Sequence, residues 1–187
     1  MTERIDYDVI TEIAETAHNL LFGDNADYCN LPNYLKEFGI NIGYAELEND
    51  MSGYLRADGK NPPQIVVNVN DSKSRQLFTM AHELGHLLMH YKWSPGKDVG
   101  INDIVEVTMY RNGTYQTSEQ TQKEIEADQF ATAFLMPKAK IAKLIIDEST
   151  RLGRKLDPSE ATSLMADTFG VSKQAANIRL NNILKKG

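Results

Sequence analysis

The chain has 187 residues, of which 41% are hydrophobic and 25% charged, a composition typical of a globular protein that can bury its own core. Its formal net charge of −6 argues against a protein that binds DNA without sequence preference. The single cysteine, Cys29, excludes an internal disulfide and a thiolate-rich zinc site. Because the N-terminus is too charged for a signal peptide and no apolar run reaches membrane-spanning length, we expect a cytoplasmic protein.

The first half of the chain is predicted to contain helices on either side of a group of strands. Apolar residues at helical spacing, with Gly23 and Gly39 as stop signals, predict two helices near the N-terminus. β-Branched residues and the turn signal Asp58-Gly59 predict three short strands after them. In chain order these are helices at 7–22 and 31–38, strands at 40–45, 53–57 and 64–69, and a further helix at 73–90.

The second half of the chain is predicted to be mostly helical. Alternating apolar residues and the pair Asn112-Gly113 predict a β-hairpin within residues 101–117. The helices expected after it lie at 118–136, 139–152, 157–169 and 173–184. We therefore expect an α+β fold, mostly helical, with a small β-sheet that precedes the helix at 73–90.

A possible metal-binding motif lies in the helix predicted at 73–90. Residues 82–86 read His-Glu-Leu-Gly-His, and His82 and His86 lie one turn apart on one face, so both imidazoles can reach one cation. Glu83 points to the side of this pair, where a carboxylate can deprotonate a water without binding the metal. Gly85 permits the close approach of another element. This HExxH arrangement predicts a catalytic zinc site; the alternative is a surface His-Glu pair on a helix.

A third metal ligand must come from outside the motif, because a catalytic zinc site normally has three protein ligands. His90 lies about 11–12 Å along the helix axis from His82 and cannot share an ion with both motif histidines. The position six residues after His86, where an extended motif carries a third histidine, is Lys92. We therefore expect His90 to lie behind the site or on the surface.

The helix predicted at 118–136 supplies two candidate glutamates. Glu124 falls at the edge of its apolar face and Glu126 further round toward solvent, so we predict Glu124 as the third ligand and Glu126 as the fallback. Asp128, four residues after Glu124, is placed to accept the free N–H of a ligating histidine. The alternative is that both glutamates only occupy the first turn of a helix, where acidic residues are favoured.

Two segments together resemble the ImmA/IrrE family of metallopeptidases. Residues 75–90 read RQLFTMAHELGHLLMH and look like the family's metal helix, and the segment that begins EIEADQFA at Glu124 looks like its second motif. The resemblance covers residues 65–137 well and the flanks loosely. The family often has Asn where this chain has Asp128, an exchange that keeps a hydrogen-bond acceptor and adds charge.

The resemblance implies a zincin-like, gluzincin-like endopeptidase with one Zn²⁺ per chain. It also implies proteolysis in the cytoplasm, with repressor-type DNA-binding proteins of mobile elements or stress regulons as substrates. In this interpretation Glu83 is the catalytic base. A donor to the oxyanion would complete the site, and the sequence does not rank the candidates Tyr54, Tyr91, Tyr110 and Tyr115. The strand at 64–69 either pairs with an extended substrate or is plain sheet structure.

The C-terminal segment has the pattern of a helix-turn-helix, with two short predicted helices on either side of Gly170. Its candidate DNA contacts are Lys173, Gln174, Asn177 and Arg179. We favour a helical hairpin packed on the peptidase, with a metallopeptidase domain at 1–152, a C-terminal subdomain at 153–187, and no direct binding to DNA or membrane.

Three functions therefore compete: an endopeptidase, a non-catalytic zinc-containing regulator that binds a repressor or transcription factor, and a DNA-binding module. Glu83 favours the endopeptidase, because a structural metal site needs no water-activating carboxylate beside its ligands.

Overall fold

The computed structural model describes residues 5–23, 26–48, 50–57, 61–96, 107–110 and 118–186. The predicted turns at Asp58-Gly59 and Asn112-Gly113, and Tyr115, lie outside these residues. Within them the fold is mostly helical with one small sheet, which confirms the predicted α+β class.

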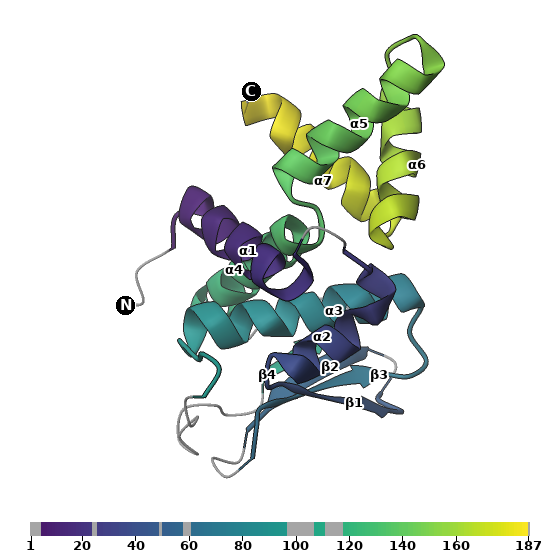
Figure 1. Cartoon of the computed structure of the whole chain (residues 1–187). Helices are drawn as coiled ribbons and strands as arrows, with labels where there is room; N and C mark the ends of the chain where they lie inside the picture. The colour runs from purple at the N-terminus through teal and green to yellow at the C-terminus, as the bar shows by residue number, and fades with distance from the viewer. Residues whose placement is uncertain are drawn as a thin grey trace.

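Every helix predicted from the sequence is present (Figure 1). The α-helices are α1 (Tyr7–Phe22), α2 (Leu31–Glu37), α3 (Lys73–Gly85), α4 (Ser118–Leu135), α5 (Lys138–Leu152), α6 (Pro158–Phe169) and α7 (Lys173–Lys186). Two shorter turns are the 3₁₀-helix η1 (Tyr28–Asn30) and the π-helical turn η2 (His86–His90). The strands are β1 (Asn41–Ala45), β2 (Met51–Arg56), β3 (Gln64–Asn68) and β4 (Val107–Tyr110).

The described strands form one four-stranded sheet in the order β1-β3-β2-β4. β3 pairs in parallel with β1 and antiparallel with β2, so neither of its edges is free. This arrangement contradicts the idea that the strand at 64–69 pairs with a substrate and leaves its plain structural role. The physical reason is in the sequence of β3, where Ile65, Val66 and Val67 are all buried, a run of β-branched residues that suits a strand with a neighbour on each side.

α3 lies between the sheet and two other helices: one side of α3 packs on the sheet, and α4 and α1 lie beyond the opposite side of α3 (Figure 1). Gly53 of β2 permits this packing: a Cβ there would lie 2.5 Å from the carbonyl oxygen of Val66 and 2.6 Å from Cγ2 of Thr79. Ser72 caps α3 by accepting a hydrogen bond from the N–H of Arg75. The helix is therefore held at its start by a cap and in its middle by close contact with a strand.

The C-terminal helices form a group beside the rest of the fold (Figure 1). Asp157 and Glu160 form a capping box at the start of α6, and Gly170 ends the helix with a φ of 67°, so the predicted helix-turn-helix pattern is present. Arg179 of α7 is buried and donates to the backbone carbonyl of Met136 and to the hydroxyl of Tyr7. Its guanidinium therefore joins α7 to the body of the protein and is not available to DNA.

Two further expectations concern a membrane-spanning segment and the division of the chain into domains. No helix in the described ranges is long and apolar enough to cross a bilayer. The predicted division at residue 152 stays a prediction.

Candidate metal centre

The HExxH motif lies in the buried second half of α3. His82 and Glu83 are fully buried and His86 is nearly so, because this part of the helix is covered by the sheet on one side and by α4 on the other. After Gly85 the helix widens into the π-helical turn η2, in which the N–H of Tyr91 donates to the carbonyl oxygen of His86. Such widened turns are frequent at functional sites.

Gly85 determines how closely α4 approaches the motif. A Cβ at this position would lie 2.9 Å from Cδ1 of Phe130 on α4, closer than side chains tolerate. The absence of a side chain at Gly85 therefore lets α3 and α4 come into contact, as the sequence predicts. The contact brings the first turns of α4, which carry Glu124, up to the two histidines.

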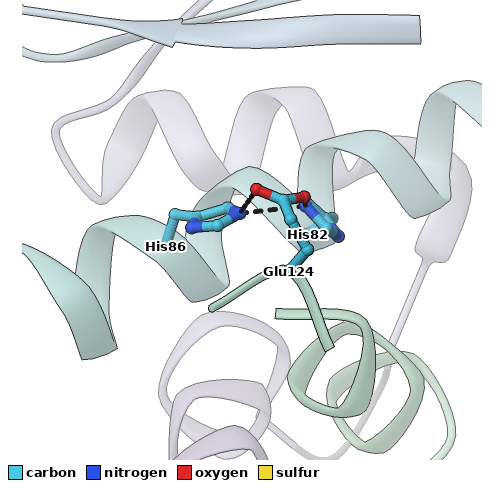
Figure 2. A group of neighbouring side chains, drawn as sticks. All are labelled: His82, His86 and Glu124. Atoms are coloured by element: carbon cyan, nitrogen blue, oxygen red, sulfur yellow. Dashed lines mark hydrogen bonds and ion pairs between the residues drawn. The ribbon is translucent and has the colours of Figure 1, made fainter. Parts of the chain in front are cut away.

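The atoms of His82, His86 and Glu124 converge on one point (Figure 2). His82 Nε2 is 3.0 Å from Glu124 Oε2, His86 Nε2 is 3.2 Å from Glu124 Oε1, and the two Nε2 atoms are 3.0 Å apart. A tetrahedral zinc ion with bonds of about 2.0–2.2 Å keeps its ligand atoms roughly 3.3–3.6 Å apart, slightly more than the distances between these three side chains. The three side chains, all buried, therefore form a group that can bind a metal ion.

Glu83 is the strongest sign that this group does more than pack. It is 0% exposed, and neither of its carboxylate oxygens has a hydrogen-bond partner within the described structure. Burial, as the largest cause, raises the pKa of Glu83 to about 8, with opposing effects from His82 and Glu124. Burying a carboxylate without hydrogen-bond partners costs free energy, and carboxylates in such surroundings are found preferentially at functional sites. The donor set and this unpaired acid together fit a catalytic metal such as zinc.

The ionisable groups of the site strongly affect one another's pKa values. Burial lowers the pKa of His82, but hydrogen bonds to Asp128 and Glu124 outweigh it and raise the pKa to about 10. Burial is the main cause that lowers the pKa of His86 to about 4. Burial raises the pKa of Glu124, but hydrogen bonds from the two histidines outweigh it and lower the pKa to about 2. Without a metal ion the group therefore contains an ionised Glu124, a neutral His86 whose lone pair is available, and a protonated His82, and a bound cation would take the place of the proton that His82 shares with Glu124.

Asp128 lies where the sequence predicts an acceptor for a ligating histidine. Its Oδ1 is 2.8 Å from Nδ1 of His82, and its side chain is 54% exposed. An acceptor at Nδ1 holds a proton on that nitrogen, so the lone pair of Nε2 can face a metal ion bound beside Glu124. The structure thus brings together four predicted residues, His82, His86, Glu124 and Asp128, from two helices.

Glu126 does not lie in the metal-binding group. It is 3% exposed, which corrects the expectation that it points toward solvent, and its Oε2 is 3.1 Å from Nε2 of His90. His90 in turn lies behind His86, with their Nδ1 atoms 2.9 Å apart. The contact between His90 and Glu126 was missed in the sequence, where the only signal was the spacing of His86 and His90, one helical turn apart.

Tyr91 is a candidate tyrosine of the described structure that the charges of the site affect. Burial raises its pKa most, followed by the charges of Glu83 and Glu124. Tyr54 lies in β2, opposite Val66 of β3, and Tyr110 lies in the edge strand β4. Tyr91 follows η2 directly, so among the described tyrosines it is the candidate donor that we carry forward.

The comparisons with known proteins agree with this geometry. No curated protein sequence matches the chain. A peptidase family model described as the IrrE N-terminal-like domain matches residues 35–181, a range that begins in α2, ends in α7 and includes the whole candidate metal centre. Residues 35–181 are well over half of the chain, and they include both segments that resemble the ImmA/IrrE metallopeptidases. The chain therefore belongs to the IrrE N-terminal-like family of metallopeptidases.

Proposed function

We propose that this protein is a zinc-dependent endopeptidase that cleaves one specific cytoplasmic regulatory protein, a repressor-type DNA-binding protein of a mobile element or stress regulon. His82, His86 and Glu124 hold one zinc ion per chain. The observation that carries the proposal is Glu83, a buried carboxylate without a hydrogen-bond partner next to three convergent ligand atoms. The family membership supports proteolysis, and the choice of a repressor as the substrate rests on the resemblance alone.

The chain's own residues have separate tasks in this mechanism. When bound, zinc supplies a Lewis acid that polarises the scissile carbonyl and makes water more acidic. Glu83 accepts a proton from the attacking water and delivers it to the amine nitrogen as the peptide bond breaks. Tyr91 donates a hydrogen bond to the carbonyl oxygen as negative charge develops there.

The test is cleavage of a candidate repressor by the wild-type protein and by Glu83→Gln. The repressor encoded beside the gene is the first substrate to try. Metal analysis should find about one zinc per chain in both proteins, because Glu83 is not a ligand. We expect the wild-type protein to cut the repressor and Glu83→Gln to lose this activity while it keeps zinc. Glu148→Gln makes the same change on the surface of α5 and serves as the matched control.

Three results would contradict the proposal in different ways. Cleavage by zinc-loaded Glu83→Gln would refute the proposed base. A repressor that binds tightly but is never cut would favour the non-catalytic regulator. A shift in the mobility of DNA fragments at low salt would favour the DNA-binding module.

A further inference from the structure

A chain of hydrogen bonds runs from the back of His86 into the protein. His86 Nδ1 lies 2.9 Å from His90 Nδ1, and His90 Nε2 lies 3.1 Å from Glu126 Oε2. The other carboxylate oxygen of Glu126 accepts hydrogen bonds from the backbone N–H of Ile5, at 3.0 Å, and from Nε2 of Gln122, at 2.8 Å. We call His90 and Glu126 together the His86 relay.

The proton positions in the relay follow from one condition. If His86 binds a metal through Nε2, its proton must be on Nδ1. That proton is then donated to Nδ1 of His90, whose own proton is on Nε2 and is donated to Glu126. An ionised Glu126 accepts all of the N–H groups that face it. With these proton positions each N–H donor in the relay has an acceptor. They also leave Nε2 of His86 without a proton, so its lone pair faces the metal position.

The relay is also well shielded from water. The side chains of His90 and Glu126 are 5% and 4% exposed, so their hydrogen bonds are little weakened by solvent. The support of the other histidine differs, because His82 contacts the half-exposed Asp128 directly. The two histidines of the motif are thus held by separate carboxylates, one at the surface and one in the interior.

We propose that His90 and Glu126 are positioning residues that fix the tautomer and ring orientation of His86 for the metal, with the backbone N–H of Ile5 as part of this support. The inference rests on the proposed function, since it takes His86 as a zinc ligand. It assigns a task to a histidine and a glutamate that do not bind the ion. It also joins the segment before α1, 121 residues away in sequence from Glu126, to the metal centre.

The first experiment measures zinc affinity by chelator competition in His90→Leu and His90→Asn. Leucine removes both hydrogen bonds of the relay, and we expect a loss of affinity of roughly 10- to 100-fold, as for other groups that orient metal ligands. Asparagine places an amide oxygen about where Nδ1 of His90 lies and still accepts the proton of His86, so it should recover most of the affinity. Thermal unfolding of the metal-free proteins shows separately what each change does to the fold.

A second measurement reports the geometry of the site directly. The visible absorption of the cobalt-substituted protein depends on the number and arrangement of ligands, and it should change in His90→Leu but not in His90→Asn. If His90 only fills space between η2 and α4, the zinc affinity and the cobalt spectrum of His90→Leu should equal those of the wild type. That result, with zinc still bound by the wild type, would overturn this inference alone. A wild-type protein without zinc affinity would overturn the proposed function as well.

The far end of the relay is tested by Glu126→Gln and by two changes at Ile5. A glutamine must turn its NH₂ group toward one of the N–H donors around Glu126, so Glu126→Gln should weaken zinc binding while the half-buried control Glu148→Gln on α5, which pairs with Arg151, does not. Ile5→Pro removes the backbone N–H, and Ile5→Ala keeps it but trims the side chain that packs on the core. We expect weaker zinc binding in the proline variant than in the alanine variant. Equal affinities would remove Ile5 from the relay.

Discussion

At the level of single residues, Glu124 and Glu126 lie two positions apart on α4 and both are buried, but Glu124 contacts His82 and His86 whereas Glu126 contacts His90. The same substitution at the two positions therefore separates a ligand from a supporting residue. Glu124→Ala removes a ligand atom, and we expect its loss of zinc affinity to exceed that of Glu126→Ala, which should stay within about 100-fold. Chelator competition measures both. The reverse order would mean that the wrong glutamate was chosen as the ligand.

His18 gives a residue-scale prediction about stability that does not involve the metal. It is 0% exposed among aromatic rings, its Nδ1 donates to the carbonyl oxygen of Phe134 at 2.7 Å, and its Nε2 has no partner within the described structure. Burial, the largest cause, lowers its pKa from 6.5, so the unfolded chain binds a proton more readily than the folded one. The stability from neutral His18 is therefore complete above about pH 6.5 and is lost as the pH falls toward the folded pKa.

The measurement is chemical denaturation of the metal-free protein between pH 7.5 and pH 5, a range set by the ordinary pKa of histidine, about 6.5. We expect the free energy of unfolding to fall by up to about 1.4 kcal/mol per pH unit because of this one proton. His18→Asn retains an N–H for Phe134 and does not titrate, so its pH dependence should be weaker than that of the wild type. An identical pH dependence in the two proteins would show that His18 is protonated without cost.

At the scale of the elements, most helices and strands could be predicted because their apolar residues follow one period and their ends carry caps. α4 is a helix whose burial cannot be predicted from its own sequence. A helical wheel assigns polar positions to solvent, but α4 is enclosed by α1 and α3, so Glu126 is buried although it falls outside the apolar face. The interior position of β3 could not be predicted from the sequence either, since strand order depends on pairing between distant segments. The π-helical turn at η2 has no periodic signal.

The contact between α3 and α4 gives a prediction about Gly85. Alanine there would gain up to about 1 kcal/mol in helix propensity, but its Cβ would lie 2.9 Å from the buried ring of Phe130. Overpacking of a tight core costs about 1–3 kcal/mol, so the clash should win and push α4 away from α3. We expect Gly85→Ala to lower the melting temperature and to weaken zinc binding, because Glu124 moves with α4. Calorimetry and chelator competition measure the two effects.

A second substitution on α4 tests the cause. Phe130→Ala removes Cδ1 and Cγ, two of the three atoms nearest to the added methyl group, so it should restore part of the zinc affinity when combined with Gly85→Ala. Zinc affinity that is unchanged in Gly85→Ala would mean that the spacing of α3 and α4 does not control the position of Glu124.

At the scale of the whole molecule, the C-terminal helices are joined to the body through a buried cation. Arg179 of α7 donates to the carbonyl of Met136, after α4, and to Tyr7 of α1, and a carboxylate oxygen of Glu15 lies 3.9 Å away. Three elements distant in sequence thus meet at one guanidinium. A helix-turn-helix that presented α7 to DNA would need its cations outside, but Arg179 is buried in the middle of α7, and the exposed lysines Lys173 and Lys185 lie near the two ends of the helix.

Arg179→Met should therefore destabilise the fold and leave any interaction with DNA unchanged. The methionine fills much of the same space but removes the donors to Met136 and Tyr7, and the loss of buried hydrogen bonds of this kind costs about 1–3 kcal/mol. Lys173→Met is the matched control on the exposed face of the same helix, where such a change should stay within about 0.5 kcal/mol. Denaturation curves compare the two variants with the wild type. Equal stability of all three would show that the C-terminal hairpin is not held to the peptidase through Arg179, and the packing of the hairpin would then rest on its apolar residues alone.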